Sequence, residues 1–119
     1  MQKILIVDDA RLMRNIIKNS IQEKGPYNIL EAENGNVAID LYKDEQPDIV
    51  TMDITMEEKN GVETAKEILA YDASAKIIMV TSLGQERLLK ECIEIGIKDY
   101  IVKPFTKERI VSAVTNCLN

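Results

Sequence analysis

The chain alternates five times between a short apolar run and a segment with the spacing of an amphipathic helix. The apolar runs are rich in isoleucine and valine, which is typical of strands that are buried on both faces of a sheet. They lie at Ile4–Val7, Ile29–Leu30, Ile49–Met52, Ile77–Val80 and Tyr100–Val102. This alternation predicts a parallel sheet, because a parallel neighbour is reached only through a long crossover, which is usually a helix.

Each helical segment places apolar residues on one helix face. The first stops at Gly25-Pro26, the fourth ends at Gly96, and the fifth starts after Thr106, a residue typical of helix N-caps. The apolar positions are Met13, Ile16, Ile17 and Ile21, then Val37, Ala38, Leu41 and Tyr42, then Val62, Ala65, Ile68 and Leu69, then Leu88, Leu89, Cys92, Ile93 and Ile95, and finally Ile110, Val111, Val114 and Leu118. We therefore expect one α/β domain over residues 1–119, with a doubly wound five-stranded parallel sheet and five helices.

The composition narrows the possible partners and chemistry. Fifteen basic and twenty acidic residues give a formal charge of −5, which disfavours binding to nucleic acid or to an anionic membrane surface. The sequence contains no histidine, so it lacks the commonest general base and zinc ligand. Any chemistry must therefore depend on carboxylates, hydroxyls and lysine.

The cysteines and the apolar runs favour a cytoplasmic location. Cys92 and Cys117 lie in helical patterns without a close-spaced partner, which is typical of reduced thiols in a protein core. Two aspartates cut off the first apolar run before it reaches the length of a signal sequence, and no later stretch approaches the length of a membrane span.

Polar side chains follow four of the five predicted strands. They are Asp8-Asp9 after the first strand, Asp53 after the third, Thr81-Ser82 after the fourth and Lys103-Pro104 after the fifth. Each has an ordinary structural interpretation when taken alone; Asp9, for example, could be a helix N-cap. In a doubly wound sheet, however, ligands bind beyond the carboxyl ends of the strands. The convergence of these residues therefore predicts a functional site.

The types of residue at this predicted site suggest its chemistry. Three carboxylates at one sheet edge repel one another unless a cation lies between them. An all-oxygen site with few protein ligands suits Mg²⁺. A carboxylate beside Mg²⁺, a lysine and a threonine hydroxyl supplies a nucleophile and groups that stabilise phosphoryl oxygens. We therefore predict phosphoryl transfer to Asp53.

The motifs around these residues resemble those of the receiver domains of two-component response regulators, and most of all those of the stand-alone chemotaxis regulators. The resemblance covers essentially the whole chain. It implies a flavodoxin-like sheet with strand order 2-1-3-4-5. The motifs are Ile6-Val7-Asp8-Asp9, Pro47 to Met56 around the acceptor, Asn60-Gly61, Val80-Thr81-Ser82 and Tyr100 to Phe105.

The resemblance implies a catalytic role for three residues. Asp53 would receive the phosphoryl group, Lys103 would pair with it, and the Thr81 hydroxyl would hydrogen-bond it. Tyr100 would turn inward as Thr81 moves, and the bond between Lys103 and Pro104 would be cis. The chain would catalyse only its own phosphorylation and dephosphorylation, so we do not expect an enzyme in the usual sense.

The resemblance also implies a metal site. Mg²⁺ would be held directly by Asp9, chiefly through water by Asp8, and also by Asp53 and the backbone carbonyl of Thr55. The chain departs from the family at Glu57-Glu58-Lys59, where receivers commonly have a proline directly after the residue equivalent to Met56 and an apolar residue at position 59. The added acids could strengthen the attraction for a cation, or could simply form a solvated loop.

The phosphoryl group must come from outside the chain, from a partner histidine kinase or from a small donor such as acetyl phosphate. The expected output surface is the fourth helix, fifth strand and fifth helix, with Leu89 and Lys90 as test positions. The first candidate for its partner is a flagellar motor switch protein, and a phosphatase is a further partner. Leu83, two residues after Thr81, suggests slow self-dephosphorylation because it is apolar.

Four other interpretations compete with this one. A flavodoxin-like electron carrier would need a hydroxyl- and glycine-rich loop after the first strand, where Asp8-Asp9 would repel the cofactor phosphate. A haloacid-dehalogenase-type phosphohydrolase would have its aspartates one residue apart, whereas these two are adjacent. An unphosphorylated pseudo-receiver, and the receiver of a phosphorelay protein or of a longer DNA-binding regulator, remain as alternatives.

Overall fold

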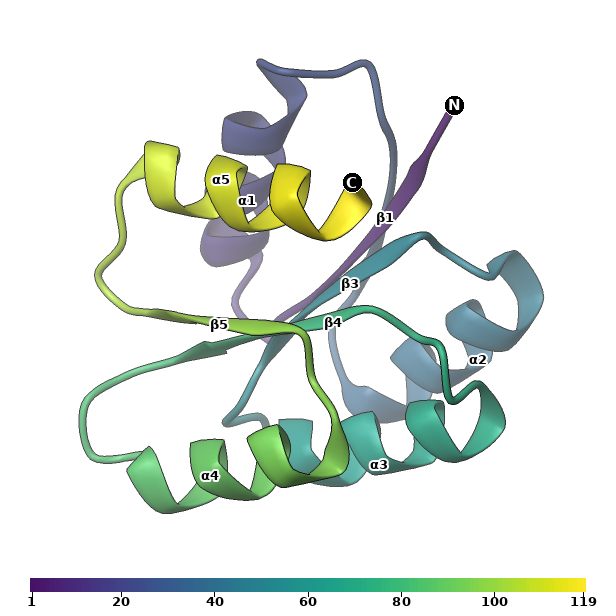
Figure 1. The fold of residues 1–119 in the computed structure, drawn as a ribbon, viewed down its shortest axis with the longest axis vertical. Coiled ribbons are helices and arrows are strands. Elements are labelled where there is room, and N and C mark those ends of the chain that lie inside the picture. Colours follow the sequence, from purple (N-terminus) through teal and green to yellow (C-terminus); the bar gives the residue numbers. More distant parts are fainter.

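The computed structural model describes residues 1–119, in which five strands alternate with five helices (Figure 1). The strands are β1 (Lys3–Val7), β2 (Asn28–Ala32), β3 (Ile49–Asp53), β4 (Ile77–Thr81) and β5 (Asp99–Val102). The helices are α1 (Arg11–Gln22), α2 (Gly35–Glu45), α3 (Gly61–Tyr71), α4 (Glu86–Ile95) and α5 (Lys107–Leu118). All neighbouring strands pair in parallel, in the order β2-β1-β3-β4-β5. The predicted fold class and strand order are confirmed.

The helices cover both faces of the sheet, with α1 and α5 on one face and α2, α3 and α4 on the other (Figure 1). Successive side chains of a strand point to opposite faces. On β1, Leu5 and Val7 therefore join the hydrophobic cluster beneath α2, α3 and α4, whereas Ile4 and Ile6 join the cluster beneath α1 and α5. Strands β3 and β4 are buried throughout, which explains their unbroken apolar sequences.

The helix ends follow the predicted signals closely. Helix α1 starts after Ala10, which has no side-chain cap, so Asp9 is not its N-cap. It ends at Gln22, just before the predicted stop at Gly25-Pro26. The Thr106 hydroxyl accepts a hydrogen bond from the Arg109 N–H at 3.1 Å, which confirms the predicted cap of α5. All five helices are too short or too polar for a membrane crossing.

Three residues predicted on inward faces are exposed instead. Ile16, Val37 and Ile93 are 42%, 38% and 52% exposed, because they lie at the margins of their apolar stripes. In α4 only Cys92 is fully buried, so the wide apolar stripe of this helix is partly core and partly surface.

The start of α3 is tied closely to the end of β3. Asn60 and Glu63 form a reciprocal capping box, in which the Asn60 side chain accepts from the Glu63 N–H at 2.9 Å. A Cβ on Gly61 would lie 2.3 Å from the carbonyl oxygen of Asp53 and 2.8 Å from the Cα of Ile54, so only glycine fits. The Gly61 N–H donates to the Ile54 carbonyl at 2.9 Å. This close approach helps to position the backbone of Asp53.

Candidate functional site

Three carboxylates gather beyond the carboxyl ends of β1 and β3. Asp8 and Asp9 directly follow β1, and Asp53 is the last residue of β3. Because these strands are neighbours, one carboxylate oxygen of each residue lies within 4.8 Å of the others. Asp8 is 1% and Asp53 7% exposed, whereas Asp9 is open to solvent. The structure thus brings together the acidic residues that the sequence analysis placed in one site.

Lys103 supplies the positive charge nearest to this cluster. Its Nζ lies 3.5 Å from Oδ1 of Asp53 and 3.6 Å from Oδ2 of Asp8. The residue follows the edge strand β5, and its long side chain reaches across the end of the sheet. The bond between Lys103 and Pro104 is cis, as the resemblance implied. One ammonium beside three carboxyl groups leaves the site short of positive charge when they are ionised.

The pKa values of the two buried carboxyl groups, Asp8 and Asp53, are both raised. Burial, and to a smaller extent the neighbouring Asp8 carboxylate, raise the pKa of Asp53 to about 6, although the charge of Lys103 opposes both. Burial also raises the pKa of Asp8, against the hydrogen bond from Ala10 and the charge of Lys103. The fold therefore holds two carboxyl groups where their ionised forms are disfavoured.

The donor set fits a hard divalent cation. Oδ1 of Asp8 accepts a hydrogen bond from the Ala10 N–H at 2.8 Å, but Oδ2 is buried without a hydrogen-bond partner. A buried carboxylate oxygen left without such a partner is costly, and a bound cation would satisfy it. The three carboxylates offer only oxygen ligands, which Mg²⁺ prefers. The residues present therefore fit Mg²⁺.

Thr81 lies at the end of β4, where a glutamine engages its hydroxyl. Thr81 is 3% exposed, and its Oγ1 lies 3.0 Å from Oε1 of Gln85. The same glutamine oxygen accepts from the Ser82 N–H at 2.8 Å and from the Ser82 hydroxyl at 3.1 Å. The Gln85 amide nitrogen donates to the hydroxyl of Thr55. The side chain of Thr55 is thus part of this network, while the role of its carbonyl as a metal ligand stays a prediction.

Two residues near the site were not predicted from the sequence. Gln85 directly precedes α4, and glutamine is not a typical N-cap residue, so no local signal marked it. Arg14 donates from Nη1 to the Asp8 carbonyl at 2.6 Å and pairs with Glu31 at 3.0 Å. The position of Arg14 four residues after Ala10 places it in the first turn of α1, but only the tertiary structure shows what its guanidinium contacts.

The predicted switch and output residues lie outside the acidic cluster. Tyr100 is 40% and Leu83 84% exposed. Leu89 is half-buried and contacts the hydrophobic cluster beneath α2, α3 and α4, and Lys90 is exposed. Their roles in switching, output and dephosphorylation stay predictions.

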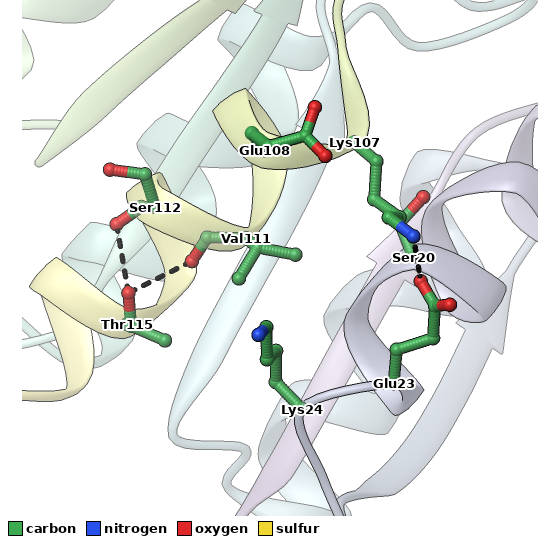
Figure 2. A pocket seen from close by; sticks show the side chains of 8 residues that line it. All are labelled: Ser20, Glu23, Lys24, Lys107, Glu108, Val111, Ser112 and Thr115. Atoms are coloured by element: carbon green, nitrogen blue, oxygen red, sulfur yellow. Dashed lines mark hydrogen bonds and ion pairs between the residues drawn. The ribbon is translucent and has the colours of Figure 1, made fainter.

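The largest pocket lies elsewhere, between α1 and α5 (Figure 2). Glu23 and Lys107 form an ion pair across it, and the Thr115 hydroxyl donates to the Val111 carbonyl at 3.0 Å. The lining residues are Ser20, Glu23, Lys24, Lys107, Glu108, Val111, Ser112 and Thr115. None of them belongs to the predicted site, so the pocket does not define the chemistry.

Comparisons with known proteins agree with this geometry. The sequence model of one protein family, described as the response regulator receiver domain, matches residues 4–115. The chain is 47% identical over 117 residues to the chemotaxis protein CheY of Bacillus subtilis (strain 168), covering 98% of each chain. It is similar to a response regulator receiver domain protein from Clostridium thermocellum, with a TM-score of 0.94 and 23% identity over 100% of this chain and 95% of that one.

A further solved structure is the CheX-CheY-BeF3-Mg²⁺ complex from Borrelia burgdorferi. The chain matches it with a TM-score of 0.91 and 33% identity, over 99% of this chain and 90% of that one. The family model spans nearly the whole sequence, and the relative from Bacillus subtilis matches along almost its full length. The chain therefore belongs to the response regulator receiver domain family.

Proposed function

We propose that this receiver domain accepts a phosphoryl group on Asp53 in an Mg²⁺-dependent reaction and then signals by binding an output protein. The observation that supports this most is the contact of Lys103 with both Asp53 and Asp8, beside Asp9. A nucleophilic carboxylate, a cation-binding oxygen set and a fixed ammonium together are the parts that phosphoryl transfer needs.

In the proposed reaction, a carboxylate oxygen of Asp53 attacks the phosphorus atom. The new bond is an acyl phosphate, and the bond that breaks is the P–N bond of a phosphohistidine or the P–O bond of acetyl phosphate. The leaving group keeps the electron pair, as a neutral imidazole after proton uptake or as acetate. The chain has no histidine, so the donor is a partner histidine kinase or a small molecule.

The other site residues act on the charge of the phosphoryl group. Lys103 pairs with a phosphoryl oxygen from a position 3.5 Å from Asp53, and Thr81 donates its hydroxyl hydrogen to another. Asp8, Asp9 and Asp53 would hold Mg²⁺, which would supply positive charge to offset the negative charge of the carboxylates and the phosphoryl group. The chain modifies itself and turns over no diffusible substrate in the usual sense.

The proposed output surface combines α4, β5 and α5. It exposes apolar side chains at Ile93 (52%), Tyr100 (40%) and Val102 (41%). The relative from Bacillus subtilis is a chemotaxis protein, which favours a flagellar motor switch protein in the cytoplasm as output partner. A phosphatase is a further proposed partner. Ile93 tests this surface better than Leu89, which is half-buried against the core.

Intact-mass spectrometry after incubation with acetyl phosphate or phosphoramidate tests the proposal. We expect one phosphoryl adduct on the wild type when Mg²⁺ is present, and none after its removal with EDTA. Asp53→Asn should form no adduct. Asp40→Asn, the same change at an exposed aspartate on α2, should behave as the wild type. No adduct under any condition would favour the pseudo-receiver, a pure interaction module.

A further inference from the structure

The side chain of Gln85 bridges two loops at the carboxyl edge of the sheet. It stands directly before α4 and reaches the ends of both β4 and β3. Its amide oxygen lies 3.0 Å from the Thr81 hydroxyl and 2.8 Å from the Ser82 nitrogen, while its amide nitrogen donates to the Thr55 hydroxyl. Thr55 lies two residues after Asp53, so the bridge links the loop that follows the acceptor to the loop that follows β4.

The orientation of this amide follows from its partners. A backbone N–H can only donate, so the atom of Gln85 that faces Ser82 must be the oxygen. The same oxygen then faces the Thr81 hydroxyl and can only accept from it. The amide nitrogen is left to donate to Thr55. The direction of each bond is therefore determined, including the one in which Thr81 is the donor.

A hydroxyl has one hydrogen to donate. In this structure the Thr81 hydrogen is directed to Gln85 at 3.0 Å, and its other acceptor, the Ser82 carbonyl, is more distant at 3.4 Å. Thr81 is 3% exposed, so water has little access to replace either acceptor. Thr81 can donate to a phosphoryl oxygen on Asp53 only after its bond to Gln85 is broken.

We propose that Gln85 is a positioning residue that retains the Thr81 hydroxyl in the unphosphorylated arrangement, so that phosphorylation competes with the hydrogen bond between Thr81 and Gln85. This inference rests on the proposed function, because it concerns the same acceptor. Removal of the Gln85 amide should shift the balance towards the phosphorylated arrangement, because the hydrogen bond between Thr81 and Gln85 is made only in the unphosphorylated one. Gln85 then sets how strongly a phosphoryl group is bound.

The first test uses the metal-free protein and needs no phosphorylation. Gln85→Met keeps the length of the side chain but loses the acceptor, whereas Gln85→Glu keeps an acceptor oxygen. Hydrogen exchange of the Ser82 amide, followed by NMR, should be faster in Gln85→Met and stay near the wild-type rate in Gln85→Glu. Equal exchange in wild type and Gln85→Met would show that the bridge does not persist in solution and would overturn the proposal.

The second test measures binding of beryllofluoride, a phosphoryl mimic, in the presence of Mg²⁺. Gln85→Met should bind it about threefold to tenfold more tightly than the wild type, as expected for the loss of one competing hydrogen bond. In a Thr81→Val background the same change at Gln85 should leave the affinity unaltered, because no hydroxyl remains to be released. Gln22→Met, at an exposed glutamine on α1, is the matched control and should match the wild type.

The outcomes separate this inference from the proposed function. If the wild type binds beryllofluoride and Gln85→Met binds it no more tightly, the function stands and the role of Gln85 is wrong. An equal gain in the Thr81→Val background would also contradict it, because Gln85 would then act without Thr81. If no variant binds beryllofluoride, both the function and the inference fail.

Discussion

Lys103 holds its ammonium 3.5 Å from the carboxylate of Asp53, yet the pKa of Asp53 rises to about 6. An opposite charge at this distance ordinarily lowers the pKa of a carboxyl group. Here burial has the larger effect, and the carboxylate of Asp8 acts in the same direction. In the metal-free site, the fold therefore disfavours the ionised form of Asp53 although Lys103 lies beside it.

The first prediction concerns the titration of Asp53. In the metal-free wild type, the carboxyl ¹³C resonance of Asp53 should titrate with a pKa of about 6. Lys103→Met should raise this pKa because it removes the favourable charge, and Asp8→Asn should lower it because it removes the repulsive one. NMR titration in EDTA measures all three proteins. A lower pKa in Lys103→Met would contradict this account of the site.

The second prediction is the stability of Asp53→Asn. The pKa of Asp53 in the fold, about 6, lies above its unfolded value of about 3.9. Between these two values the folded protein binds more protons than the unfolded chain, so its stability falls as the pH rises, and the loss is complete above the folded pKa. At neutral pH, metal-free Asp53→Asn should therefore exceed the wild type by about 1–3 kcal/mol in free energy of unfolding.

Urea unfolding in EDTA at a series of pH values checks this prediction. The advantage of Asp53→Asn should disappear below about pH 4, where the aspartate is protonated in both states. Asp40→Asn, an exposed change, should stay within about 0.5 kcal/mol of the wild type at neutral pH. An Asp53→Asn protein that is less stable than wild type at neutral pH would disagree with the raised pKa.

The third prediction concerns the acidic loop after Met56. Asp9, Glu33, Asn34, Glu57 and Glu58 line one hollow. Combined Glu57→Gln and Glu58→Gln changes should weaken Mg²⁺ binding by about twofold to threefold at low ionic strength, because they remove long-range attraction. High salt should abolish the difference. Isothermal titration measures the Mg²⁺ affinity, and Glu94→Gln on α4 is the control. Equal affinities of the wild type and the double variant at low salt would mean that the loop is only solvated and does not attract the cation.

The fourth prediction concerns a buried hydroxyl in β3. Thr51 is 1% exposed, and its Oγ1 has no hydrogen-bond partner. Thr51→Val replaces this hydroxyl with a methyl group of similar size, so the free energy of unfolding should rise by about 1 kcal/mol. Thr64→Val is the matched control, because the Thr64 hydroxyl donates to the Asn60 carbonyl at 2.9 Å and its loss should destabilise the protein. Urea unfolding at neutral pH measures the free energy of unfolding of both variants. A Thr51→Val protein that is less stable than the wild type would contradict this prediction.

The fifth prediction concerns the lifetime of the phosphorylated state. Leu83, two residues after Thr81, is 84% exposed in the loop that leads to α4. An apolar side chain cannot orient an attacking water molecule, whereas an amide can, so Leu83→Asn should shorten the half-life of the acyl phosphate. Leu12→Asn, at a leucine that is 73% exposed on α1, should leave it unchanged. Loss of the phosphoryl adduct over time gives the half-lives, and equal values for wild type and Leu83→Asn would refute the prediction.

Much of this molecule was predictable because the information is local. The alternation of apolar runs and helical segments determined the fold class, since only parallel strands need such crossovers. Asp8, Asp53 and Lys103 directly follow predicted strands, which indicated that they would meet, because the carboxyl ends of parallel strands share one edge. Thr106 was identifiable as an N-cap because its partner lies three residues away.

The sequence by itself thus determined the architecture and the chemical types gathered at the sheet edge. Only the tertiary structure decided how those groups are tuned, because tuning depends on distances between segments that are far apart in the chain. The raised pKa of Asp53 arises from its burial and its distance from Asp8. The bond from Gln85 to Thr55, thirty residues away, depends on how two loops approach each other, and neither loop alone indicates it.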